Sequence, residues 1–182
     1  LLGLNELFGQ PLGPAQLQTL AATLGSDAPF FLQSMPALAV GRGEQVQSLE
    51  PFASLHGMAI LLVHPGFGIS TPWAYRELAR FPSALNGERG RAQRLVDSLR
   101  NCELAAAAPD FYNSLEAPAL EKFPVLALYQ EFFREHGALV ALMSGSGSTT
   151  FAIFPTRTKA EAAVAPFEAR FGSASWLAVV NL

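Results

Sequence analysis

Five consecutive residues near the C-terminal end combine small size with hydrogen-bonding groups: Ser144, Gly145, Ser146, Gly147 and Ser148. This segment, the Gly-Ser loop, separates two apolar stretches, 138–143 and 149–154, that are typical of strands. Glycine lets a backbone approach a ligand closely, and consecutive N–H groups can bind an anion. The segment therefore predicts a phosphate- or ligand-binding loop, with an ordinary hairpin turn as the alternative. No Gly-Lys-Ser/Thr follows it, which excludes a Walker A loop.

A single carboxylate, Asp27, lies where a helix is predicted to begin, two positions before Pro29. Beside apolar Phe30 and Phe31, such a carboxylate is held in place and could accept a proton from a substrate hydroxyl. From the spacing alone, an ordinary helix N-cap is the favoured interpretation.

Thr71 and Tyr75 are four residues apart on a predicted helix, so their side chains share one face. A hydroxyl one turn before an aromatic ring could offer a hydrogen bond and a stacking surface to a base or a sugar. The alternative is a helix cap followed by a packing aromatic.

Metal chemistry has little support in the sequence. His56, His64 and His136 lack the spacing of a metal site, and the single cysteine, Cys102, excludes an intrachain disulfide and a Cys-rich zinc site. We therefore predict no protein-bound metal centre.

The composition limits the class of protein. The chain has 182 residues, 50% of them apolar and 15% charged, with a formal net charge of −3. Such a chain has no basic surface for nucleic acid, and its apolar runs reach only six residues, as at 58–63, against the ~20 that a membrane span needs. We expect a cytoplasmic α+β protein with no nucleic-acid or membrane partner.

The remaining pattern predicts the elements that position these residues. Helices are expected at 1–9 and 13–25, a strand at 37–40 with a glycine turn after it, and a strand buried on both faces at 58–64. Ser70 or Thr71 is expected to cap the next helix, and Pro124 to break a later one. Thr158 is expected to cap a helix that ends near Gly172, before a last strand at 176–180.

Five segments occur in an order typical of one family: residues 24–32 (LGSDAPFFL), 39–44 (AVGRGE), 65 with 70–75 (P and STPWAY), 113–116 (NSLE) and 143–149 (MSGSGST). In type and order they resemble the 4-diphosphocytidyl-2-C-methyl-D-erythritol kinases of the GHMP kinase superfamily. The likeness covers nearly the whole chain; the family often has Asp in place of Ser114. Each segment alone is weakly specific, whereas five in register are specific.

The resemblance implies a two-domain α+β fold. Residues 1–52 would be the remnant of an N-terminal, ribosomal-S5-like ATP-binding domain, and residues 53–182 the α+β C-terminal domain. It also implies phosphoryl transfer from ATP, with Mg²⁺, to the 2-hydroxyl of a cytidylyl substrate, 4-diphosphocytidyl-2-C-methyl-D-erythritol, in non-mevalonate isoprenoid biosynthesis.

Particular residues match the family's site. Asp27 matches the catalytic base or orienting carboxylate, and Thr71 and Tyr75 match positions that line the cytidine pocket. The resemblance also makes Gly41 and Gly43 candidate substrate-binding residues.

The Gly-Ser loop matches the family's third glycine motif, beside the reacting phosphates. The residues that carry this match are Gly145, Ser146, Gly147 and Ser148.

The chain also departs from the family pattern. Members carry a Pro-x-x-x-Gly-Leu-Gly-Gly-Ser-Ser phosphate loop and an early lysine before the place of Leu1, and this sequence has no lysine before Lys122. We therefore expect the chain alone to be inactive. Two alternatives stay open: a GHMP kinase for another small alcohol, or a non-catalytic binding module on the same fold.

Overall fold

The computed structural model describes residues 1–41, 43–101 and 103–182. Arg42, within the glycine turn, and Cys102 therefore lie outside the described residues. The chain divides into two compact units, an N-terminal unit, Leu1–Pro51, and a C-terminal unit, Phe52–Leu182. The identity of the first as an ATP-binding domain stays a prediction.

The described residues of the N-terminal unit form two helices, a short 3-10 helix and a two-stranded sheet: α1 (Leu2–Leu7), α2 (Pro14–Leu24), η1 (Ala28–Leu32), β1 (Ala37–Val40) and β2 (Gln45–Ser48). Helix α2 begins as the sequence predicts, because Pro14 occupies its first position and Gly13 N donates to Gln16 Oε1 at 2.9 Å. β1 and β2 pair antiparallel, with Ala37 opposite Ser48.

The C-terminal unit contains a four-stranded sheet and most of the helices. Its strands are β3 (Ala59–His64), β4 (Val140–Met143), β5 (Thr150–Phe154) and β6 (Trp176–Asn181). Its helices are η2 (Ala53–Leu55), α3 (Thr71–Leu78), α4 (Pro82–Asn86), α5 (Arg91–Asn101), α6 (Leu104–Ala107), η3 (Ala108–Asp110), α7 (Glu116–Lys122), α8 (Val125–Glu135), α9 (Arg157–Ala162) and α10 (Val164–Phe171).

The sheet of the C-terminal unit is antiparallel, in the order β4-β5-β3-β6. The central strand β3 pairs with β5 through Leu61 opposite Ala152, and with β6 through Leu61 opposite Val179. β4 is therefore an edge strand, with only β5 beside it. This antiparallel sheet with its helices confirms the predicted α+β class.

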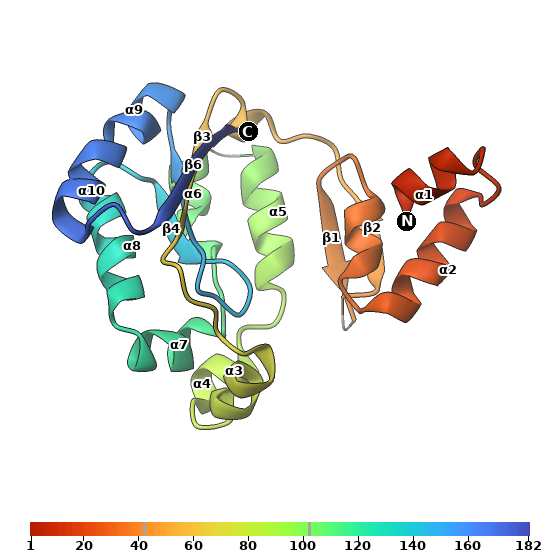
Figure 1. The fold of residues 1–182 in the computed structure, drawn as a ribbon, viewed down its shortest axis with the longest axis horizontal. Coiled ribbons are helices and arrows are strands. Elements are labelled where there is room, and N and C mark those ends of the chain that lie inside the picture. Colours follow the sequence, from red (N-terminus) through yellow and green to blue (C-terminus); the bar gives the residue numbers. More distant parts are fainter. Residues whose placement is uncertain (42, 102) are drawn as a thin grey trace. The chain divides into compact units, whose positions relative to one another are not determined.

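Helices cover both faces of this sheet, as Figure 1 shows for α8 and α10 on one side and α5 on the other. Alternate residues of β3 divide between the two layers: Leu61 is buried in the larger core, whereas Ile60 packs against the smaller one. The larger core contains Phe133 of α8 and Phe167 of α10, and the smaller contains Leu99 of α5. The three layers give the strand ends, and the loops after them, a rigid support.

Two local predictions change in detail, and a third is confirmed. β3 is fully buried on one face only, because Ile60 and every second residue after it in the strand stay half-buried. Of the two predicted caps of α3, Ser70 is the N-cap, and it accepts a hydrogen bond from Trp73 N at 3.4 Å. Near the C-terminal end, Thr156 rather than Thr158 is the N-cap of α9, and Ala163 separates α9 from α10.

Across the described ranges, no helix is both long and apolar enough to cross a membrane.

Candidate functional site

The Gly-Ser loop closes a hairpin between β4 and β5. Ser144 N donates to Thr149 O at 2.8 Å, and Gly147 N donates to Ser144 O at 3.0 Å, so the loop is an ordered turn. Gly145 has φ +56° and Gly147 has φ +88°. A Cβ on Gly147 would stand 2.5 Å from Met143 Sδ, so glycine is required by both the backbone conformation and the packing.

Two hydroxyls of the loop contact α3 and the segment before it. Ser148 is buried, and its Oγ donates to Phe67 O. On the other side of the turn, Ser146 Oγ lies 2.8 Å from Thr71 Oγ1. The predicted base-binding residue Thr71 is therefore a direct neighbour of the predicted phosphate loop, although 75 positions separate it from Ser146 in the sequence.

Tyr75 lies one turn after Thr71 on α3, and 62% of its surface is exposed. Since it is neither buried nor hydrogen-bonded to a described residue, the ring is available to stack on a ligand. The packing-aromatic alternative does not describe it. The aromatic of α3 that does pack is Trp73, which contacts Phe123 and lies under Lys122 Nζ at 4.3 Å.

Asp27, Gly41 and Gly43 belong to the N-terminal unit. Asp27 is exposed and occupies the N-cap position of η1. Its side chain makes no capping hydrogen bond, so Asp27 does not act as a side-chain cap. Gly43 has φ +112°, and a Cβ there would stand 2.6 Å from Asp27 Oδ1. The structure thus brings Asp27 and Gly43 together, while Gly41 lies nearer Glu44.

Two side chains that were signalled only by the family resemblance, Asn113 and Glu116, support the Gly-Ser loop. Asn113 Nδ2 donates to Met143 O and to Gly145 O, both at 2.8 Å. Glu116 Oε1 accepts from Met143 N at 2.6 Å. Burial of the Glu116 carboxyl raises its pKa above the usual value, although the bonds from Met143 and Gln130 and the charge of Arg134 oppose this. The Asn-x-x-Glu spacing at the start of α7 was the one signal for this pair in the sequence.

A cavity of about 590 Å³, which no sequence motif signals, adjoins the loop on the side of α5. Ser144, Gly145 and Asn113 are among the residues that line this cavity. The segment between α4 and α5 and Tyr112 also line it.

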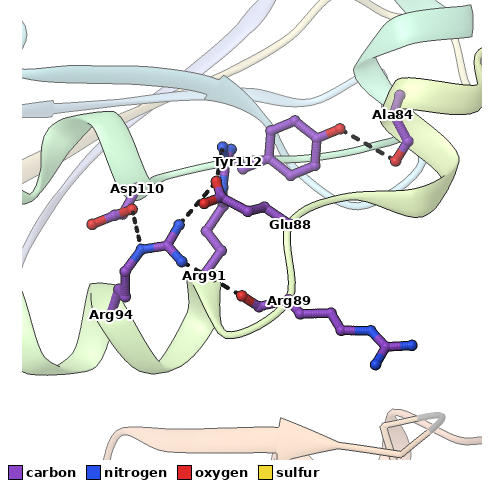
Figure 2. A network of polar contacts seen from close by, with 7 residues as sticks. All are labelled: Ala84, Glu88, Arg89, Arg91, Arg94, Asp110 and Tyr112. Atoms are coloured by element: carbon purple, nitrogen blue, oxygen red, sulfur yellow. Dashed lines mark hydrogen bonds and ion pairs between the residues drawn. The ribbon is translucent and has the colours of Figure 1, made fainter.

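Figure 2 shows the polar network around this segment and Tyr112. The Glu88 carboxylate forms ion pairs with Arg91 Nη2 at 3.1 Å and Arg94 Nη2 at 2.9 Å. These contacts lower the pKa of the Glu88 carboxyl, and the hydrogen bond from Arg91 has the largest effect. The Arg91 guanidinium also lies 4.4 Å from the centre of the Tyr112 ring, and Arg94 Nε lies 3.4 Å from Asp110 Oδ1. The network orders the entry to α5 with paired charges.

No group of three His, Cys, Asp or Glu side chains in the described part of the chain could hold a metal ion. A Mg²⁺ ion held mainly by the phosphates of a nucleotide needs only one or two carboxylates, so the ion that the resemblance implies stays a prediction.

Comparison with known proteins places this geometry in a family. The family model for the C-terminal domain of GHMP kinases matches residues 92–173. The chain is 38% identical over 167 residues to a 4-diphosphocytidyl-2-C-methyl-D-erythritol kinase of Thermosynechococcus vestitus, covering 86% of this chain and 53% of that protein. The chain contains the C-terminal domain of the GHMP kinases.

Further relatives agree with this assignment. A 4-diphosphocytidyl-2-C-methyl-D-erythritol kinase of Pelobacter propionicus is 36% identical over 181 residues, covering 99% of this chain and 59% of that protein. The crystal structure of a 4-(cytidine 5'-diphospho)-2C-methyl-D-erythritol kinase matches with a TM-score of 0.74 at 30% identity, covering the whole of this chain and 62% of that one. The homoserine kinase of Cytophaga hutchinsonii, with a TM-score of 0.75 at 18% identity, shares the GHMP kinase fold. The chain spans about half the length of the curated relatives it matches.

Proposed function

We propose that this chain provides part of an enzyme that transfers a phosphoryl group from ATP to the 2-hydroxyl of 4-diphosphocytidyl-2-C-methyl-D-erythritol. The observation that carries the proposal is the 2.8 Å contact between Thr71 Oγ1 and Ser146 Oγ. It joins the candidate cytidine-binding helix to the candidate phosphate loop, as the phosphorylation of a cytidylyl compound requires. The names of the relatives support this choice of substrate.

Three groups of this chain have separate roles in the proposed reaction. Tyr75 stacks on the cytosine ring, and Thr71 offers its hydroxyl to the same ligand. The Gly-Ser loop lies beside the phosphates, where backbone N–H groups stabilise negative charge. Gly43, which leaves room beside Asp27, lets the substrate approach this carboxylate.

In the transfer step, the substrate's hydroxyl oxygen attacks the γ-phosphorus of ATP and forms a new P–O bond. The bond from this phosphorus to the oxygen it shares with the β-phosphorus breaks, and ADP leaves with that electron pair. Asp27 accepts the hydroxyl proton or orients the hydroxyl. Phosphoryl transfer depends mainly on positioning and charge stabilisation, which a carboxylate beside the substrate hydroxyl and a rigid glycine loop can supply.

The decisive experiment measures ATP-dependent phosphorylation of the cytidylyl substrate by the chain alone and by the chain joined behind the N-terminal part of the Thermosynechococcus vestitus relative. We expect turnover in the joined protein and none in the chain alone. In the joined protein, Asp27→Asn should lower kcat by about a hundredfold or more, whereas Asp97→Asn, an exposed aspartate on α5, should leave it unchanged. Wild-type turnover by the Asp27 variant would refute the role of Asp27.

Nucleotide binding distinguishes this substrate from another small alcohol. The joined protein should bind CMP, and Tyr75→Ala should weaken binding about tenfold, because stacking on a base contributes about 1–3 kcal/mol. Tyr112→Ala, which removes a half-exposed tyrosine from the cavity by α5, is the matched control. Absence of CMP binding alongside an active kinase would favour a different alcohol, and absence of any binding would favour the non-catalytic module.

A further inference from the structure

The outer edge of β4 is occupied by side chains. Because β4 is an edge strand, half of its backbone polar groups face away from β5 and need other partners. Arg134 Nη2 donates to Ala141 O at 2.7 Å, and Glu116 and Asn113 take the N–H and the carbonyl of Met143. The last residue before the Gly-Ser loop is thus held on both of its backbone polar groups.

Asn113 extends this hold into the loop itself. Its amide nitrogen has two hydrogens, one for Met143 O and one for Gly145 O, so the side chain spans the first turn of the loop. Its oxygen accepts from Leu115 N at 3.0 Å, which sets the orientation of the amide. Rotation of this side chain would break three hydrogen bonds at once.

Glu116 is fixed in turn by a chain of contacts from α8. Its Oε1 accepts from Gln130 Nε2 at 2.7 Å, and Gln130 is buried, with 4% of its surface exposed. Gln130 Oε1 accepts from Arg134 Nη2 at 3.2 Å. A half-buried carboxylate with these partners has a low tolerance for displacement, because an unpaired charge at this depth is strongly unfavourable.

We propose that Asn113 and Glu116 are positioning residues of the Gly-Ser loop: they hold the end of β4 and the first turn, and so set the direction of the loop's N–H groups. The effect of this on catalysis rests on the proposed function. The positioning itself does not, because it follows from contacts within the C-terminal unit.

Amide hydrogen exchange in the chain, followed by NMR, tests the positioning directly. Asn113→Asp keeps the shape of the side chain but turns acceptor oxygens toward two carbonyls. Exchange at the Ser144 and Gly147 amides should accelerate at least about tenfold, while Leu61 in the central strand keeps its rate, because local opening does not require global unfolding. Ser114→Asp, which adds the same charge one residue away, is the matched control and should leave the loop amides unchanged.

Glu116 offers a rescue experiment. Glu116→Leu removes the acceptor of Met143 N and should accelerate exchange at Ser144 and Gly147. Glu116→Gln keeps an Oε1 that can accept from both Met143 N and Gln130, and should restore slow exchange. Equal acceleration at Leu61 and at the loop amides, or unchanged exchange in the loop for Asn113→Asp and Glu116→Leu, would overturn the proposal.

Kinetics of the joined protein separate this inference from the function on which it rests. Asn113→Asp should lower kcat about tenfold to a hundredfold, since small displacements of positioned groups have effects of this size, and leave KM for the cytidylyl substrate within about threefold. Faster loop exchange with unchanged kcat would refute the loop's place at the phosphates. If the joined wild-type protein has no activity, the proposed function fails, and the exchange rates alone decide the positioning.

Discussion

Apolar side chains are buried to different extents in the two units of this protein. In the C-terminal unit, large rings are almost completely removed from solvent, among them Phe132, Phe133, Phe154 and Phe167. In the N-terminal unit, α1 buries none of its residues, and more than half of the surface is exposed for Leu4, Leu7, Phe8, Leu24 and Phe31. Apolar content alone therefore does not tell which residues form a core.

The difference follows from architecture and size. A four-stranded sheet with helices on both faces creates two buried layers, whereas β1 and β2 form only a hairpin, which has little stability by itself. A unit of about fifty residues also buries a smaller fraction of its surface than a larger one. We infer that most of the free energy of unfolding comes from the C-terminal unit, where the Gly-Ser loop needs a rigid base.

The strongest test of this comparison replaces one phenylalanine in each unit. Phe167 packs against Tyr129, Phe133 and other rings of the larger core, so Phe167→Ala should lower the free energy of unfolding by about 3–5 kcal/mol. Phe31→Ala, at a side chain that is 74% exposed, should change it by about 0.5 kcal/mol or less. Chemical denaturation followed by circular dichroism measures both. Similar losses for the two variants would contradict the comparison.

Glycines with close neighbours provide a second, smaller contrast. Gly147→Ala combines a positive φ with a clash against buried Met143, so we expect it to lower the local free energy of opening by about 2–3 kcal/mol. Gly43→Ala meets the exposed carboxylate of Asp27, which can turn away, so a loss of about 1–2 kcal/mol is expected from the backbone alone.

Amide exchange in each hairpin gives these local free energies. Gly172→Ala, with φ +83° and no atom within 4 Å of the added Cβ, measures backbone strain without a clash. A loss for Gly147→Ala no larger than that for Gly172→Ala would show that the loop is not closely packed.

The smallest expected effect concerns pH. Burial raises the pKa of Glu116 in the folded state, so the folded protein binds this proton more readily than the unfolded chain. The contribution of Glu116 to stability is therefore largest at acidic pH and is lost as pH rises through its ordinary value, near 4.5, toward the raised one. Glu116→Gln does not titrate, so its stability relative to wild type should improve between pH 4 and pH 7. Denaturation midpoints across this range measure the difference between the two proteins. A variant that becomes less stable relative to wild type as pH rises would contradict the prediction.

Much of the local structure was predictable because its signals are local. Gly13 with Pro14 starts α2, Gly25 ends it, and Pro124 separates α7 from α8, as the sequence predicts. The place of Thr156 as a cap was missed because the competing Thr158 has the same chemistry, and the choice depends on where β5 ends. For the candidate site, residue types and order led to the family, while the roles of Asp27 and of the Gly-Ser loop stay predictions.

The sequence by itself determined where the chain turns, which residues are apolar and which hydroxyls, amides and carboxylates are available, because these depend on neighbouring residues and side-chain chemistry. The tertiary structure decided that Thr71 meets Ser146 and that Asn113 holds Gly145, over separations of 75 and 32 residues. Those contacts depend on the register of β4 against β5 and on the packing of α7 and α8 against the sheet. A hydrogen bond of this kind forms only after the buried layers have fixed the backbone on both sides of it.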